Sequence, residues 1–407
     1  MANLRLPGPT PVPPDVVEAM SKEMIDHRGA EFAEMLRRIT ANLQRAFLTQ
    51  NDVFVFTSSG TGAMEAAIVN TLSPGERVLA ISVGNFGDRF ARIATAYGAD
   101  VKVLKFPDGE AVDPERVRQA LADDPAVSAV LVTHNETSTG ITNELEAIAG
   151  IVKGEFDKLI LVDAISSLGS INLPVDAWDL DVVLAGSQKG WKCPPGLAMI
   201  SFSARAWKAS ETATMPKFYF SLAEAKKSFG LGQTPWTPAI SLMYGLDHSL
   251  QQMLAQGDME SVYAFHQQIA QYTRDGLKAL GLELVATEEK YASNTVTAAY
   301  LPEGVKDQDL LDMLRDDYDI IAAEGRGLLA GRRLGGADRH AAVDLPAVRV
   351  DDLGLRARCE IERRRRLAGG GGADDEDDGG LGCVVVCHRW QRITRRCGGG
   401  PSPVPFD

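Results

Sequence analysis

Between residues 53 and 203 the chain alternates short apolar runs with stretches whose apolar residues recur every three or four positions. The first pattern predicts β-strands and the second predicts amphipathic helices. We expect strands over 53–59, 77–83, 101–106, 128–135, 158–164, 181–187 and 196–202, and helices over 63–72, 86–98, 113–123 and 143–154. Strands rich in Val, Ile and Leu between helices indicate a mostly parallel sheet covered on both faces. The predicted fold class is therefore α/β, with a doubly wound sheet whose ligands bind beyond the carboxyl ends of the strands.

The pattern differs on either side of this segment. Residues 1–50 contain two proline clusters and then a helical pattern, so we expect an extended arm that leads to a helix. Residues 51–255 form the expected large domain. Residues 256–326 combine helical stretches with strand-like runs, which predicts a smaller α+β domain.

After residue 326 the composition changes. No lysine follows Lys306, whereas arginine, glycine and cysteine become frequent and neither period continues. One interpretation of residues 327–407 is a disordered, low-complexity tail. The other, which we favour, is translation in a shifted frame of a GC-rich gene, which would leave the small domain incomplete.

Charge and cysteine content narrow the class of protein. A formal net charge of −13 argues against nucleic-acid binding, which needs clustered lysine and arginine. No run approaches the roughly 20 apolar residues of a membrane span, and the first residues lack a signal-peptide core. Only Cys193 precedes residue 350, so we expect no disulfide framework, no metal site and a cytoplasmic location.

Three residues at or after strand ends carry the candidate chemistry. Asp163 ends one apolar strand, Lys189 follows another, and Phe86 follows a third. The stretch FTSSGTGAMEAAIVN over 56–70 places a glycine-rich turn at a helix start, where backbone N–H groups favour a phosphate. An amine, a buried carboxylate, an aromatic face and a phosphate turn are the parts that a pyridoxal phosphate site needs.

The order of the motifs SSGTGA, GNFGDR, HNETSTG, LVDAISSLG and GSQKGWKCPPGLA resembles class V (fold type I) pyridoxal-phosphate aminotransferases. The resemblance covers about residues 4–326 and is strongest to the branch of alanine–glyoxylate and serine–glyoxylate (serine–pyruvate) aminotransferases. It implies a large domain with a mostly parallel sheet, a smaller C-terminal domain, pyridoxal 5'-phosphate as cofactor, and a homodimer with shared active sites.

The resemblance also implies roles for individual residues. Lys189 matches the Schiff-base lysine, and Asp163 matches the aspartate that pairs with the pyridine nitrogen. The other implied cofactor contacts are Gly60, Thr61, Gly62, Phe86, Thr139 and Gln188, together with Thr237 and also Thr234 from the neighbouring subunit. Pro7 and Gly8 match a loop that closes over the substrate, and Arg333 is the candidate for the substrate carboxylate.

The implied reaction moves an amino group from alanine or serine to glyoxylate or pyruvate by a ping-pong mechanism. The sequence does not choose among these donors and acceptors, because they differ by small groups that the pocket shape distinguishes. Two alternatives stay open. One is a lyase or hydrolase of the desulfurase or kynureninase kind, and the other is a protein that binds the cofactor but turns over poorly because of the altered C-terminus.

Overall fold

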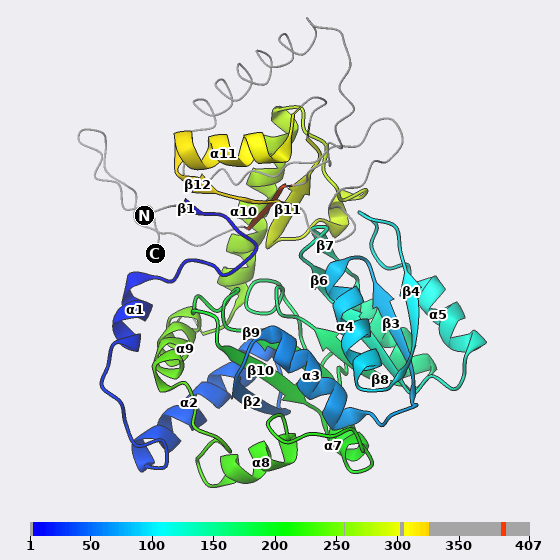
Figure 1. The fold of residues 1–407 in the computed structure, drawn as a ribbon, viewed down its shortest axis with the longest axis vertical. Coiled ribbons are helices and arrows are strands. Elements are labelled where there is room, and N and C mark those ends of the chain that lie inside the picture. Colours follow the sequence, from blue (N-terminus) through cyan, green and yellow to red (C-terminus); the bar gives the residue numbers. More distant parts are fainter. Residues whose placement is uncertain (1–2, 256, 302–304, 325–383, 388–407) are drawn as a thin grey trace, which may run out of the picture.

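The computed structural model describes residues 3–255, 257–301, 305–324 and 384–387 (Figure 1). A seven-stranded sheet with the order β2-β10-β9-β8-β5-β3-β4 forms the centre of the large domain. Its strands are β2 (Asp52–Thr57), β3 (Arg77–Ser82), β4 (Asp100–Lys105), β5 (Ala129–Thr133), β8 (Leu159–Asp163), β9 (Val182–Gly186) and β10 (Leu197–Phe202). Only β10 pairs antiparallel to its neighbours. The predicted α/β class with a mostly parallel sheet is confirmed.

Helices cover both faces of this sheet. One face packs against α3 (Gly60–Thr71), α4 (Asn85–Ala96), α7 (Ala204–Ser210) and α8 (Leu222–Gly230). The other packs against α1 (Pro14–Met20), α2 (Ala30–Phe47), α5 (Pro114–Asp123), α6 (Leu145–Ala149), the π-helical turn η1 (Gly150–Glu155) and α9 (Ile240–Met253). Alternate residues of β3 enter the two cores, since Val78 and Ala80 face one and Leu79 and Ile81 the other. None of the described helices combines the length and apolar character needed to cross a bilayer.

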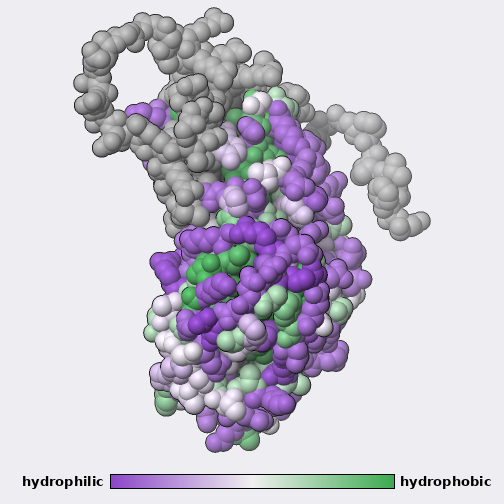
Figure 2. Space-filling view, turned by 90° about the vertical axis from the view of Figure 1, so that its right-hand side faces the viewer, coloured by the Kyte–Doolittle hydropathy of each residue, from purple (hydrophilic) through white to green (hydrophobic). Residues whose placement is uncertain are grey.

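One edge of the sheet is the half-exposed strand β4. It carries Lys102 and Lys105, and charged side chains on an edge strand discourage pairing with another chain. Figure 2 looks at the side of the molecule that carries β4 in Figure 1, and the surface there is mostly hydrophilic. This edge is therefore suited to contact with water.

The small domain lies above the large domain in Figure 1. Its elements are α10 (Glu260–Ala279), η2 (Glu289–Tyr291), β11 (Val296–Ala299), α11 (Asp307–Tyr318), β12 (Ile320–Ile321), β13 (Ala323–Glu324) and β14 (Val384–Cys387). The sequence pattern predicts no strand after residue 326, yet β14 pairs antiparallel with both β11 and β13. Three consecutive valines favour a strand, but the run is too short to stand out in an arginine- and glycine-rich segment. The remainder of 327–407 lies outside the described residues.

The N-terminal arm joins the two domains. Strand β1 (Asn3–Leu4) pairs in parallel with β12 of the small domain. Seven residues further on, the backbone N–H of Thr10 donates to the carbonyl oxygen of Gln188 in the large domain, at 3.0 Å. The arm therefore runs from the small-domain sheet to the turn after β9, where Lys189 lies.

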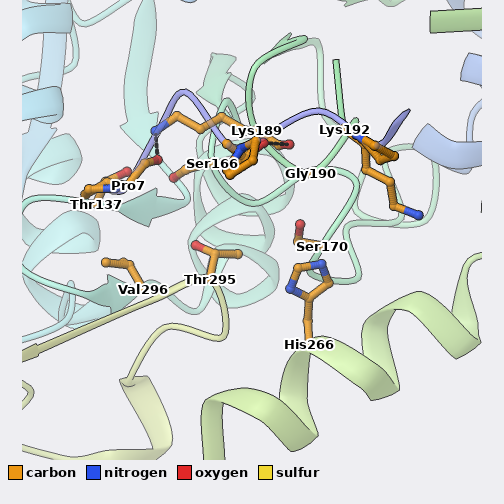
Figure 3. A pocket seen from close by; sticks show the side chains of 13 residues that line it. Pro7, Thr137, Ser166, Ser170, Lys189, Gly190, Lys192, His266, Thr295 and Val296 are labelled. Carbon is orange, nitrogen blue, oxygen red and sulfur yellow. Dashed lines mark hydrogen bonds between the residues drawn. The ribbon is translucent and has the colours of Figure 1, made fainter. Parts of the chain in front are cut away.

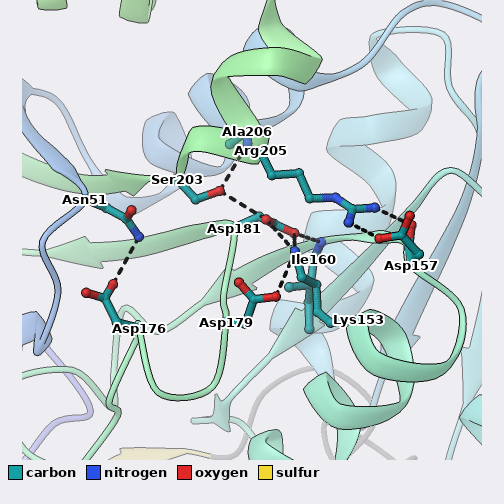
Figure 4. A network of polar contacts seen from close by, with 10 residues as sticks. All are labelled: Asn51, Lys153, Asp157, Ile160, Asp176, Asp179, Asp181, Ser203, Arg205 and Ala206. Atoms are coloured by element: carbon teal, nitrogen blue, oxygen red, sulfur yellow. Dashed lines mark hydrogen bonds and ion pairs between the residues drawn. The ribbon is translucent and has the colours of Figure 1, made fainter.

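A buried ion pair holds the far side of the large domain together (Figure 4). The Nζ of Lys153 lies 2.7 Å from a carboxylate oxygen of Asp181, and both side chains are almost fully buried. Asp181 also accepts from the backbone N–H of Ile160 and from the hydroxyl of Ser203, both at 3.0 Å. These bonds connect η1, β8 and the start of α7.

We expect Asp181→Ala to lower the free energy of unfolding by about 3 kcal/mol, because it leaves the buried Lys153 ammonium with only the exposed carboxylate of Asp179, 3.4 Å away. Urea unfolding followed by circular dichroism measures the change. The matched control is Asp157→Ala, which removes an exposed carboxylate paired with Arg205 and should cost far less, because water screens an exposed ion pair. Equal losses in the two variants would contradict the prediction.

Candidate active site

A pocket lies where the arm, the large domain and the small domain meet (Figure 3). Its lining residues are Pro7, Thr10, Pro11, Pro13, Thr137, Ser166, Ser170, Lys189, Gly190, Lys192, His266, Thr295 and Val296. Lysines and a histidine are thus the only ionisable residues among the described residues that line it. The pocket is suited to an anionic ligand.

Lys189 enters this pocket from the turn that follows β9. Its Nζ donates to the carbonyl oxygen of Pro7, as Figure 3 shows. Gly8 has a φ of +146°, and a Cβ built on it would lie 2.8 Å from that Nζ. A glycine is therefore needed where the arm crosses the lysine.

Asp163 is the last residue of β8, and its side chain is buried. Its Oδ1 accepts from the backbone N–H of Ile165 at 3.0 Å. Burial is the main reason why the pKa of this carboxyl is raised to about 7, and the nearby charge of Glu136 raises it further. The charges of Lys189 and Arg89 act in the opposite direction, so these three groups all lie within electrostatic reach of Asp163.

The glycine-rich turn forms the first turn of α3. Ser59 is the N-cap, and its hydroxyl accepts from the backbone N–H of Gly62 at 3.4 Å. A Cβ on Gly60 would lie 2.5 Å from Ile165, directly after the Asp163 strand, and one on Gly62 would lie 2.0 Å from the Ser58 hydroxyl. The close approach that glycine permits brings this helix N-terminus to the strand end that carries Asp163.

Arg89 links that turn to the candidate aromatic residue. Its guanidinium lies 4.8 Å from the centre of the Phe86 ring, and its Nη1 donates to the Thr61 hydroxyl at 3.4 Å. The Thr139 hydroxyl, in the loop after β6 (Asn135–Glu136), donates to the carbonyl oxygen of Val83 at 3.3 Å. Phe86, Thr61 and Thr139 are thereby held at the same ends of the strands.

Two predicted residues do not join this group within the described part of the chain. Thr234 and Thr237 line a separate pocket with Tyr219 and Trp236. Arg333 lies outside the described residues.

Other residues of the site were not singled out from the sequence. Glu136 and Arg89 belong to motifs that we quoted, but the sequence does not show that they approach Asp163. His266 comes from α10 of the small domain and points toward Ser170 (Figure 3). Its Nδ1 is buried without a hydrogen-bond partner among the described residues, and burial lowers its pKa to about 4. A histidine in a long amphipathic helix carries no signal of such a position.

Comparison with known proteins bears on this site. The model of the family "Aminotransferase class-V" matches residues 2–329. The chain belongs to the class V aminotransferases. Among its curated relatives, the small subunit of a soluble hydrogenase from Synechococcus sp. (strain PCC 6716) is 42% identical over 81% of this chain and 86% of that protein. L-aspartate–glyoxylate aminotransferase of Paracoccus denitrificans (strain Pd 1222) is 36% identical over 80% and 83%.

A solved structure agrees with this membership. The alanine–glyoxylate aminotransferase of Nostoc sp. superposes with a TM-score of 0.79 and 30% identity, over 90% of this chain and 95% of that one. Class V aminotransferases of this fold depend on pyridoxal phosphate (PLP), so the chain is a PLP-dependent transaminase.

The residues present fit this cofactor. Lys189 supplies the amine and Asp163 the buried carboxylate, while the α3 N-terminus offers N–H groups suited to a phosphate. The Oε1 of Gln188, next to the lysine, is buried and has no hydrogen-bond partner among the described residues. A polar ligand at this position would satisfy it, and the buried polar groups of proteins are as a rule satisfied.

The raised pKa of Asp163 predicts a pH-dependent stability in the protein without cofactor. Between about pH 4 and pH 7 the folded state keeps this proton and the unfolded state has lost it, so stability falls as the pH rises through this window. We expect the wild type to lose up to about 1.4 kcal/mol per pH unit relative to Asp163→Asn. Urea unfolding of both proteins at pH 5, 6 and 7 measures this difference, and a constant difference would refute it.

Proposed function

We propose that this transaminase moves the amino group of a small L-amino acid, alanine or serine, to glyoxylate or pyruvate. The observation that carries the proposal is the pocket at Lys189, whose described lining contains two lysines and no carboxylate. Amino and keto acids bring a carboxylate to such a pocket, and a cationic lining attracts it.

The names of the relatives agree on the acceptor but differ in the donor. The Paracoccus and Nostoc proteins have glyoxylate in their names as a shared partner, with L-aspartate and alanine as the respective donors. Glyoxylate is therefore our first choice of acceptor. The soluble hydrogenase subunit does not alter this proposal, because Lys189 lines this pocket and its charge acts on the buried carboxyl of Asp163, as PLP chemistry would require.

When bound, PLP supplies a ring that accepts electrons from the substrate's Cα. In our proposal Asp163 holds a proton on the ring nitrogen through its carboxylate. Lys189 provides the amine that takes the proton from Cα and returns it, as a general base and acid. The arm at Pro7 and Gly8 covers this amine and excludes water.

The remaining contacts complete the proposed site. Gly60, Thr61, Gly62 and Gln188 would bind the phosphate, Phe86 would stack on the ring, and Thr139 would approach it from the loop after β6. Arg333 remains the candidate for the substrate carboxylate.

The desulfurase alternative is not favoured. Such an enzyme needs a reactive thiolate, whereas Cys193, the one cysteine whose side chain the structure describes, is fully buried and burial raises the pKa of its thiol to about 12. Gln188 also stands directly before Lys189, where the desulfurase relatives carry a histidine. Impaired turnover remains the second candidate, since the small-domain segment that carries Arg333 has an unusual composition.

We further propose a cytoplasmic homodimer. The pocket that contains Thr234 and Thr237 lies beside an exposed aromatic group, in which Phe218 stacks on Trp236 with ring centres 4.7 Å apart. Phe218 is 77% exposed, and a cluster of this kind is typical of a subunit interface. Association there would bring the two threonines to the active site of the partner subunit.

The visible absorbance of the purified protein tests the reaction. We expect the band of the lysine-bound cofactor to fade with L-alanine or L-serine and to return with glyoxylate. L-aspartate serves as the competing donor. The control Lys189→Ala should lower the rate by roughly 10²–10⁴-fold, the usual contribution of a general acid–base group. A band that no amino acid changes would refute the proposed donors and favour impaired turnover.

The dimer proposal predicts that Phe218→Ser weakens self-association by about 2 kcal/mol, the scale of an interface hot spot. Sedimentation velocity over a concentration series measures this constant. Val103→Thr is the control, because it also exposes a polar group but lies on β4, at the opposite edge of the sheet. A wild type that sediments as a monomer would refute the dimer.

A further inference from the structure

Helix α4 begins without a cap of its own. Its N-cap residue is Gly84, which has no side chain to accept from the first N–H groups of the helix. In most helices a nearby Ser, Thr, Asp or Asn does this. Here the acceptors come from the last residue of β6 and from the loop that follows it, about 50 residues further along the chain.

Glu136 and Ser138 supply these acceptors. The Oε2 of Glu136 accepts from the backbone N–H groups of Phe86 and Gly87, at 2.9 and 3.1 Å. The hydroxyl of Ser138 accepts from the N–H of Asn85 at 3.0 Å. The other carboxylate oxygen, Oε1, accepts from the N–H and the hydroxyl of Ser138, at 3.0 and 2.5 Å. One carboxylate thereby joins the first turn of α4 to the loop.

This carboxylate is fully buried, which costs free energy unless it is well bonded. Three backbone N–H groups and the positive end of the α4 dipole offset part of that cost, although burial still raises the pKa of this carboxyl. The approach is close: a Cβ on Gly84 would lie 2.6 Å from the Cγ of Glu136 and 2.5 Å from the hydroxyl oxygen of Ser138. Gly84 is therefore required for the contact, and the contact has little freedom to shift.

The two segments that Glu136 joins are those that carry Phe86 and Thr139. The backbone N–H of Phe86 donates one of the hydrogen bonds to Glu136, and Thr139 follows Ser138 in the chain. The charge of Glu136 also acts on Asp163. Glu136 thus lies beside the cofactor site, but its hydrogen bonds are with backbone and side-chain groups of the protein.

We propose that Glu136 is a positioning residue for PLP, which fixes Phe86 and Thr139 in one arrangement around the cofactor ring. The inference rests on the PLP dependence of the chain and on the proposed contacts of Phe86 and Thr139, but not on the choice of donor or acceptor. Because the carboxylate already occupies the N-terminus of α4, that helix is closed to the cofactor phosphate. The N-terminus of α3 is the one that stays available for the cofactor phosphate.

The test measures PLP binding to the full-length protein after the cofactor has been removed. Glu136→Ala deletes the acceptors, and Glu136→Gln keeps the shape but replaces one acceptor oxygen with a donor. The matched control is Asp181→Asn, which alters another buried carboxylate with several hydrogen bonds, on the far side of the domain. Absorbance titration gives the dissociation constant of PLP and the position of its visible band, and thermal unfolding gives the stability of each cofactor-free protein.

We expect Glu136→Ala to raise the dissociation constant of PLP by about tenfold or more, the equivalent of a lost charge-assisted hydrogen bond, and to shift the visible band. Glu136→Gln should change both in the same direction by less. Asp181→Asn should lower the melting temperature but leave the constant within about twofold of wild type. If Glu136→Ala does not fold, Glu136→Gln alone decides.

Two results would overturn the inference. One is unchanged PLP affinity and an unchanged band in the Glu136 variants. The other is an equal loss of affinity in Asp181→Asn, which would assign the effect to general destabilisation. Neither result depends on which amino acid the enzyme accepts, so a wrong donor assignment cannot be mistaken for a wrong role of Glu136.

Discussion

The structure of this site depends on a carboxylate held out of water at the end of a strand. Asp163 is buried, and its ionised form is penalised by that burial and by the neighbouring charge of Glu136. Arg89 and Lys189 offset this penalty in part. A carboxyl in this balance is suited to pair with a protonated ring nitrogen, because a cation supplied by the ligand compensates the buried charge.

The parallel sheet makes this balance possible. Strands β5, β8 and β9 run parallel, so their carboxyl ends lie on the same side of the sheet. Residues that follow these strands therefore meet although they are far apart in the chain. The antiparallel strand β10 continues the sheet beside β9 and packs in the core below the Lys189 turn. The N-terminal arm then covers the site, because β1 pairs with β12 of the small domain and Thr10 is hydrogen-bonded to the turn after β9.

Several parts of the fold and site could be predicted because they break a local rule. Asp163 is a charged residue at the end of an apolar strand. The glycines of the 56–70 stretch stand at the start of a helical pattern, where glycine is a poor helix former. The class of sheet could be predicted for a different reason, because the alternation of strands and helices is itself a local pattern. These signals are carried by neighbouring residues, so the sequence shows them directly.

The sequence by itself determined the α/β class, the order of the main strands and helices over 53–202, and the residue types on which PLP chemistry depends. Only the tertiary structure decided that Glu136 caps α4, that Arg89 joins Thr61 to Phe86, and that β14 enters the small-domain sheet. The physical reason is that periodicity and capping are local properties. Contacts between residues tens of positions apart depend instead on how the sheet and its loops pack, which no local pattern records.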